Sequence, residues 1–254
     1  MTGILLSGCN GKMGKVITAA AANTDDIEIV GGIDLNTEAG AGYPVFASPA
    51  EVASEVIART DVIIDFSNPS AFAGLIEFAV KAAKPAVFAT TGLNEAQLTL
   101  LHHAADKIPV FFAANMSLGV SLISELAQKA AKVLGKDFDI EIVEMHHNQK
   151  VDAPSGTALM LADSIKEALG EDMRYEYDRH AKREKRGKNE IGIHSVRGGT
   201  ITGEHEIIFA GHDEIIKISH SARSKELFAT GAINAARFLC GKPAGLYGMK
   251  ELIG

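Results

Sequence analysis

Short apolar runs alternate with alanine-rich stretches over the first half of the chain. Residues 4–7, 27–34 and 62–66 have the length and composition of buried β-strands. Between such runs, residues 15–23 and 70–83 place apolar side chains three or four positions apart, which is the spacing of a helix. Strands that alternate with helices indicate a parallel sheet with helices on both of its faces.

The hydrophobic pattern changes near residue 117. It predicts a long helix over 119–135, a strand over 140–147 and a second helix over 158–170. Three strand-like stretches then follow one another without a helix between them: residues 190–199, 203–211 and 213–222. Because only a short gap separates the last two, we predict a hairpin, and hence a mixed or antiparallel sheet.

These patterns predict two domains and an α/β fold overall. Residues 1–117 form a parallel-sheet domain, and a long amphipathic helix over 225–241 returns to it, so residues 225–254 belong to the same domain. Residues 118–224 form a smaller α+β domain.

Composition narrows the class of protein. The chain has 254 residues, of which 46% are apolar, so it can bury a large core. Its net charge of −7 argues against nucleic acid, and the basic run 174–190 is interpreted as a solvated loop. No apolar run is long enough to span a membrane, so no membrane partner is expected. Two cysteines without metal-ligand spacing favour the reducing cytoplasm.

A glycine-rich turn joins the first predicted strand to the first predicted helix. Gly8, Gly11 and Gly14 would let the backbone approach a pyrophosphate, and the helix start would supply free N–H groups. Asp34 ends the next strand, 20 residues after Gly14, where a carboxylate can bind ribose hydroxyls. The turn therefore predicts a dinucleotide cofactor.

The same carboxylate bears on the choice of cofactor. Asp34 would repel a 2′-phosphate, and Leu35 and Asn36 follow it in place of an arginine, although Lys12 lies in the glycine loop. We therefore expect NADH, NADPH or both, with NADH favoured.

Two more turns follow strands, where a doubly wound sheet binds its ligand. ATTG (89–92) and AANMS (113–117) carry small side chains and hydroxyls that suit a nicotinamide ribose and carboxamide.

The segment EMHHNQKVDAPSGTA (144–158) is rich in reactive side chains. His146 and His147 have ordinary pKa values near neutrality, as proton transfer requires. Lys150 adds a positive charge, and Gly156 and Thr157 begin the helix, where N–H groups attract anions. The segment predicts a pocket in which a carboxylate-bearing molecule is protonated. A His–His metal site is the alternative, but no Cys or carboxylate at ligand spacing supports it strongly, so no metal is predicted.

This segment resembles the signature of the 4-hydroxy-tetrahydrodipicolinate reductase (dihydrodipicolinate reductase) family of lysine and diaminopimelate biosynthesis. The resemblance extends over nearly the whole chain through these further motifs: SGCNGKMGK, DFSNP (65–69), ATTG, FAANMSLGV (112–120) and SVRGGTITGEHEIIFAG (195–211). It implies a Rossmann-type nucleotide domain, an open mixed sheet in the second domain, and a homotetramer assembled through that sheet. It also implies hydride transfer from NAD(P)H to a cyclic dicarboxylate imine.

Site residues follow from the resemblance by motif position. It implies that His146 is the general acid and that Lys150 assists protonation and binds a carboxylate. His147 would contact the substrate, and Gly156 with Thr157 would hold a carboxylate. The implied cofactor contacts are Gly8, Cys9, Asn10, Gly11, Lys12, Met13, Asp34, Ala89, Thr90, Thr91, Ala113, Ala114, Asn115 and Met116.

Two rival functions remain open on the sequence. One is another two-domain dehydrogenase, acting on aspartate or diaminopimelate, which would not need the histidine–lysine segment. The other is a regulatory protein that binds NADH without turnover; it would need a DNA- or partner-binding module, and none is evident in the sequence.

Overall fold

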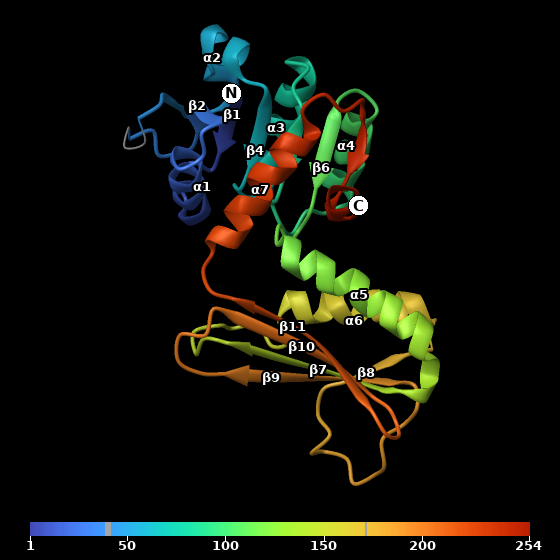
Figure 1. Ribbon diagram of the computed structural model, residues 1–254. Helices are drawn as coiled ribbons and strands as arrows, with labels where there is room; N and C mark the ends of the chain where they lie inside the picture. Colours follow the sequence, from blue (N-terminus) through green and yellow to red (C-terminus); the bar gives the residue numbers. More distant parts are fainter. Residues whose placement is uncertain (39–41, 171) are drawn as a thin grey trace. The chain divides into compact units, whose positions relative to one another are not determined.

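The computed structural model describes residues 1–38, 42–170 and 172–254. It divides into two units, of which the first is Met1–Leu118 with Lys225–Gly254 and the second is Gly119–Ser224 (Figure 1). Each unit has its own hydrophobic core.

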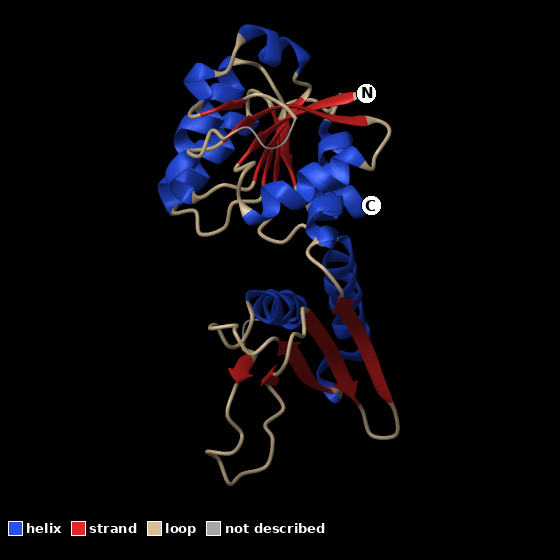
Figure 2. Ribbon diagram, turned by 90° about the vertical axis from the view of Figure 1, so that its left-hand side faces the viewer, coloured by secondary structure: helices blue, strands red, loops and turns tan. Residues whose placement is uncertain are grey.

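The first unit is built on a seven-stranded parallel sheet with the order β12-β6-β5-β4-β1-β2-β3. Its strands are β1 (Thr2–Ser7), β2 (Ile27–Ile33), β3 (Val45–Phe46), β4 (Val62–Asp65), β5 (Ala86–Phe88), β6 (Pro109–Phe112) and β12 (Gly245–Tyr247). All residues of β4 and β5 are buried, because helices cover both faces of the sheet (Figure 2).

Helices pack on both faces of this sheet. One core cluster joins α1 (Lys12–Ala22) and α7 (Glu226–Leu239) to the sheet. The other face is covered by α2 (Ser54–Arg59), α3 (Pro69–Lys81) and α4 (Glu95–Ala105). The remaining short helices of the unit are η1 (Pro49–Glu51) and α8 (Met249–Ile253).

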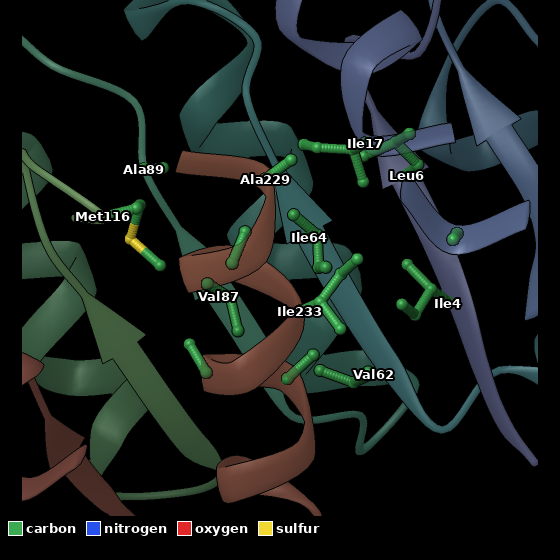
Figure 3. Packing of buried hydrophobic residues seen from close by; sticks show 14 of the residues in the cluster. Ile4, Leu6, Ile17, Val62, Ile64, Val87, Ala89, Met116, Ala229 and Ile233 are labelled. Atoms are coloured by element: carbon green, nitrogen blue, oxygen red, sulfur yellow. The ribbon is translucent and has the colours of Figure 1, made fainter. Parts of the chain in front are cut away.

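The close approach of α7 depends on small side chains. Ile17 of α1 and Ile233 of α7 pack against Ile4 and Ile64 of the sheet (Figure 3). A Cβ atom on Gly231 would lie 1.7 Å from the carbonyl oxygen of Met116, so only glycine fits at that point of the helix. The helix α7 therefore belongs to the core of the first unit.

The second unit is built on a five-stranded mixed sheet with the order β11-β10-β7-β9-β8. Its strands are β7 (Asp139–His146), β8 (Arg174–Glu176), β9 (Glu190–Arg197), β10 (Gly203–Ala210) and β11 (Ile215–Ala222). β10 pairs antiparallel with both β7 and β11, whereas β9 pairs parallel with β7 and β8. The predicted hairpin is β10–β11, and the predicted fold class is confirmed.

Two helices cover one face of the second sheet. These are α5 (Leu118–Leu134), which a short turn η2 (Gly135–Asp137) follows, and α6 (Gly156–Leu169) (Figure 1). Along β7, Ile140 and Ile142 belong to the core beneath these helices. Since side chains two positions apart share a face, Glu144 and His146 continue the same row. The side chains on this face of β7 are therefore apolar where the strand begins and titratable where it ends.

The basic run 174–190 is more ordered than a solvated loop. Its first residues form β8, and Arg186 donates hydrogen bonds to Glu141 and Asp139 of β7 and to the carbonyl oxygens of Ile140 and Glu190. Most of the segment between β8 and β9 is an exposed loop, as interpreted, and residues 177, 178 and 180–185 are exposed. The contacts of Arg186 with β7 were not predicted, because Glu141 and Asp139 lie 45 and 47 residues away in the sequence.

Candidate functional site

The glycine turn after β1 has the strained geometry that its residues predict. Gly8 has a φ of +76°, which is unfavourable for other residues. A Cβ atom on Gly14 would lie 2.2 Å from the carbonyl oxygen of Gly8 and 2.5 Å from that of Cys9, so α1 packs directly on the turn. Gly11 is the N-cap of α1, and no side chain caps this helix start. Its first N–H groups are available to an anion.

Asp34 follows β2 and binds the glycine turn. One carboxylate oxygen accepts a hydrogen bond of 2.9 Å from the backbone N–H of Asn10, and the other accepts one of 3.0 Å from that of Asn36. The side-chain amide of Asn10 donates to the carbonyl oxygen of Asn36 over 2.6 Å. The two cofactor signals in the sequence are therefore joined directly in the structure.

A cavity of about 540 Å³ opens beside this turn within the first unit. Its wall includes Gly8, Gly11, Asp34, Phe66 and Ser67. The last two belong to the DFSNP segment after β4, which our predicted contacts left out. A polar segment after a buried strand was the available signal, because the ends of parallel strands meet at one edge of the sheet.

The two remaining predicted turns differ in exposure. Ala89 and Thr90 are buried, and Thr91 is exposed. Ala113 and Asn115 are half-buried, and Ala114 is exposed.

Three contacts implied by the resemblance differ in their surroundings. The side chains of Cys9 and Met116 belong to the core of the first unit, so only their backbone atoms are available to a ligand. Burial, followed by the charge of Asp34, raises the pKa of the Cys9 thiol to about 11. Lys12, by contrast, is exposed.

In the second unit, His146 ends β7 and is tied to Glu144. Its Nδ1 atom lies 2.6 Å from a carboxylate oxygen of Glu144, whose side chain is fully buried. Arg197 of β9 donates two hydrogen bonds to the same carboxylate, over 2.8 and 2.7 Å. Burial alone would raise the pKa of Glu144, but hydrogen bonds from Arg197, Ser195, His146 and Ser155 outweigh it and lower that pKa to about 2. Glu144 is therefore a carboxylate at neutral pH.

Ser155 links the strand end to the start of α6. Its backbone N–H donates to Glu144 over 3.1 Å, and its hydroxyl, as the N-cap, accepts a hydrogen bond of 3.1 Å from the N–H of Ala158. The same hydroxyl lies 3.0 Å from Nε2 of His205 on β10. Gly156 and Thr157 are the first two residues of α6, and Gly156 is exposed.

His205 is buried and packs edge-on against His146, with ring centroids 5.2 Å apart. Burial, followed by the nearby charge of His146, lowers the pKa of His205 to about 4. It is therefore neutral at physiological pH.

Lys150 and His147 lie on the loop between β7 and α6. The N–H of Lys150 donates to the carbonyl oxygen of His147, which closes a turn, and the ammonium group lies 2.8 Å from Asp152. The hydrogen bond from Lys150 lowers the pKa of Asp152. Because the side chain of Asp152 is 59% exposed, a bound carboxylate can compete with it for Lys150.

Three further residues, which the sequence did not single out as site residues, lie around His146: Glu144, Arg197 and His205. Each lies within or beside a quoted motif, and the period of β7 places Glu144 on the face of His146. The predicted residues of the glycine turn lie in the first unit, and those of the histidine–lysine segment lie in the second.

Within the described ranges, no group of three or more His, Cys, Asp or Glu side chains could hold a metal ion. None of the described helices is both long and apolar enough to cross a membrane.

Two solved structures show the fold. A dipicolinate-bound dihydrodipicolinate reductase from Paenisporosarcina sp. TG-14 matches with a TM-score of 0.81 and 25% identity, covering 99% of both chains. A C. glutamicum DAP dehydrogenase in complex with DAP matches with a TM-score of 0.60 at 13% identity over 100% of this chain and 95% of its own. The second likeness concerns the fold alone.

Comparison with protein sequences identifies the family. The family model described as "Dihydrodipicolinate reductase, N-terminus" matches residues 2–116, and "Dihydrodipicolinate reductase, C-terminus" matches residues 119–253. A 4-hydroxy-tetrahydrodipicolinate reductase of Caldanaerobacter subterraneus subsp. tengcongensis is 51% identical over 100% of this chain and 98% of its own length. One from Clostridium tetani is 48% identical over 98% of this chain and 96% of its own. With both halves matched and identities of this size, the chain belongs to the dihydrodipicolinate reductase family.

Proposed function

We propose that this protein reduces 4-hydroxy-tetrahydrodipicolinate, via dihydrodipicolinate, to tetrahydrodipicolinate with NAD(P)H, in lysine and diaminopimelate biosynthesis. The observation that carries the proposal is the pairing of His146 with a buried carboxylate, next to the start of α6. The names of the relatives and the dipicolinate bound to the structural neighbour support the same substrate class. The reaction is therefore that of an oxidoreductase.

The first unit would hold the cofactor, and the fit rests on its glycine turn. The backbone of Gly8, Gly11 and Gly14 leaves room for a pyrophosphate at the uncapped start of α1. The reduced nicotinamide, when bound, supplies the hydride. The proposed contacts remain Gly8, Cys9, Asn10, Gly11, Lys12, Met13, Asp34, Ala89, Thr90, Thr91, Ala113, Ala114, Asn115 and Met116.

Asp34 supports a preference for NADH within this cofactor class. Its carboxylate stands at the edge of the cavity, where it would accept ribose hydroxyls and repel a 2′-phosphate. Exposed Leu35 follows it, and no cationic side chain comes directly after it to offset that repulsion. Titration of NADH and NADPH by fluorescence tests the preference: a tighter Kd for NADPH contradicts it.

The second unit would hold and protonate the substrate. The N–H groups at Gly156 and the hydroxyl of Thr157 would bind one carboxylate, and Lys150 would bind a carboxylate and assist protonation. His147 would contact the ring. His146 would donate the proton that neutralises the charge left by hydride addition to the conjugated imine.

The second sheet supports a proposed homotetramer. Its face opposite the helices carries the half-buried Val143 and Met145 and the exposed Val196. Light scattering measures the mass in solution, and a monomer contradicts the proposal. The proposed compartment is the cytoplasm, which suits the free thiols of Cys9 and Cys240.

A turnover assay tests the function. NADH absorbance is followed with the purified protein and the product of the upstream synthase, made in the same cuvette. We expect rapid NADH oxidation that the double variant His146→Gln/Lys150→Ala abolishes, whereas His102→Gln, at an exposed position on α4, leaves it unchanged. Oxidative turnover of diaminopimelate or aspartate, or NADH binding without turnover, would favour the rival functions.

A further inference from the structure

The Glu144 carboxylate has all of its acceptor positions occupied. One oxygen accepts from Nη1 of Arg197 at 2.8 Å and faces Nδ1 of His146 at 2.6 Å. The other accepts from Nη2 of Arg197 at 2.7 Å and from the backbone N–H of Ser155 at 3.1 Å. A buried carboxylate held by these four contacts cannot turn without breaking several hydrogen bonds.

These contacts determine which ring nitrogen of His146 carries the fixed proton. A guanidinium ion is always charged, so the bidentate contact with Arg197 keeps Glu144 ionised. An ionised carboxylate only accepts hydrogen bonds, so Nδ1 of His146 must be the donor. The exchangeable proton of this imidazole is then carried by Nε2.

Gly203 of β10 lies beside that second nitrogen. A Cβ atom at this position would come within 3.0 Å of Nε2 and 3.4 Å of Cδ2 of His146. The edge-on contact with His205 fixes the plane of the ring from another side. With glycine at position 203, no side chain of that residue covers Nε2.

We propose that Glu144 is the positioning residue for the proton donor: it holds one proton on Nδ1 of His146, so that Nε2 delivers the other to the substrate, and Gly203 keeps Nε2 accessible. This inference rests on the proposed function, because it assigns a direction to the proton transfer made there. The arrangement matches the general rule that a carboxylate fixes the tautomer of a catalytic imidazole.

Several charged or titratable groups surround His146 within the second unit. Glu144 lies on its own strand, Arg197 on β9, His205 on β10 and His220 opposite His205 on β11. Lys150 and Asp152 lie on the loop that follows. Burial lowers the pKa of both His205 and His220, so neither adds a positive charge beside His146 near neutral pH.

The tautomer can be read on the unmodified protein. ¹⁵N NMR of imidazole-labelled protein, above the pH at which His146 loses its proton, should show Nδ1 protonated and Nε2 bare, with His146→Gln assigning the signal. A wild-type signal with the proton on Nε2 overturns the proposal. This measurement needs no turnover and holds even if a Glu144 variant fails to fold.

Glu144→Gln tests the role in turnover. An amide can donate to Nδ1, which would move the proton to Nε2 and leave the wrong tautomer. We expect kcat to fall at least about 100-fold, which is the usual contribution of a general acid. The KM for substrate and the Kd for pyridine-2,6-dicarboxylate should change by less than about threefold, because substrate binding is left intact. The proposal is overturned if Glu144→Gln keeps the wild-type kcat, or if its loss of kcat/KM comes from a higher KM alone.

The same strand offers a matched control. Glu141 of β7 faces the opposite side of the sheet and contacts Nε2 of His194 at 2.7 Å, so Glu141→Gln changes another Glu–His pair. This control should keep wild-type kcat and the wild-type signal of His146. Gly203→Ala should also lower kcat without moving the proton from Nδ1. If the Gly203→Ala variant keeps full activity, Gly203 is not needed to keep Nε2 accessible.

Failure of this inference differs from failure of the proposed function. If His146→Gln is inactive while Glu144→Gln is fully active, the proposed function stands and Glu144 is not the positioning residue. If the wild-type protein turns over no substrate, the proposed function fails, and the NMR signal still reports the tautomer.

Discussion

Thr90 donates its hydroxyl hydrogen to a carboxylate oxygen of Asp65 over 2.6 Å, inside the first unit. The other oxygen of Asp65 accepts the backbone N–H of Ser67 at 3.1 Å. A single carboxylate, which is fully buried, thus joins the turns that follow β4 and β5. Because Thr90 and Ser67 belong to turns of the proposed cofactor site, this link fixes the spacing of its wall.

Thr90→Val should destabilise the protein and weaken cofactor binding. The valine keeps the shape but leaves one oxygen of buried Asp65 without this donor, at a cost of about 1–3 kcal/mol. Urea unfolding measures the loss, and fluorescence titration should show weaker NADH binding. Thr90→Ser keeps the hydroxyl and should stay near wild type; equal losses in both variants would contradict the explanation.

Gly14→Ala should distort the glycine turn. The added Cβ atom would overlap the carbonyl oxygens of Gly8 and Cys9, and such overpacking costs about 1–3 kcal/mol. We expect the NADH Kd to rise at least about tenfold, which corresponds to about 1.4 kcal/mol. Gly74→Ala on α3 meets nothing within 4 Å and should leave the unfolding free energy unchanged or raise it by up to about 1 kcal/mol. Unchanged NADH binding in Gly14→Ala would argue against the turn as the pyrophosphate site.

Arg197→Met should be strongly destabilising. It leaves the buried charge of Glu144 without its cation, which costs about 3–5 kcal/mol in typical buried pairs. Arg59→Met breaks the exposed pair with Glu28 and should cost less than about 1 kcal/mol. Urea denaturation compares the two variants, and a similar small loss in both would mean that Glu144 is not held as an ion.

Stability should fall as the pH falls through the range set by His205. The pKa of His205 is about 4 in the folded protein and about 6.5 for an ordinary histidine. Between these two pH values, the unfolded chain is protonated at this residue and the folded protein is not. The unfolding free energy is therefore lost as the pH drops from 6.5 to about 4, by up to roughly 3 kcal/mol from this group. His220, whose pKa is also lowered, acts in the same direction. Urea unfolding across this range should show a flatter profile for His205→Gln, and an unchanged slope would contradict the assignment.

Much of the fold was predictable because its signals are local. The apolar run 62–66 predicted β4, and the spacing of residues 70–83 predicted α3, each within two residues of the observed bounds. The two-residue strand β3 and the six-residue helix α2 were missed, because stretches so short carry no clear period and neither contains a continuous apolar run like that of β4.

The site was predictable only in part. His146, Lys150 and the start of α6 lie in one continuous segment, so their proximity can be inferred from the sequence. Arg197 could not be assigned to Glu144, because 53 residues separate them and only the parallel pairing of β7 with β9 brings them together. The neutrality of His205 depends on burial, which no local pattern reports.

The helix α7 has a consequence for how the protein is made. A ribosome makes the chain from its N-terminus, so the second unit, Gly119–Ser224, is synthesised before residues 226–239. Until then the sheet built by β1 and β4 lacks the apolar cover that Ala229, Ala232 and Ile233 provide. All segments of the inserted unit therefore precede α7 in the order of synthesis, whereas the unit that begins the sequence receives its last helix at the end.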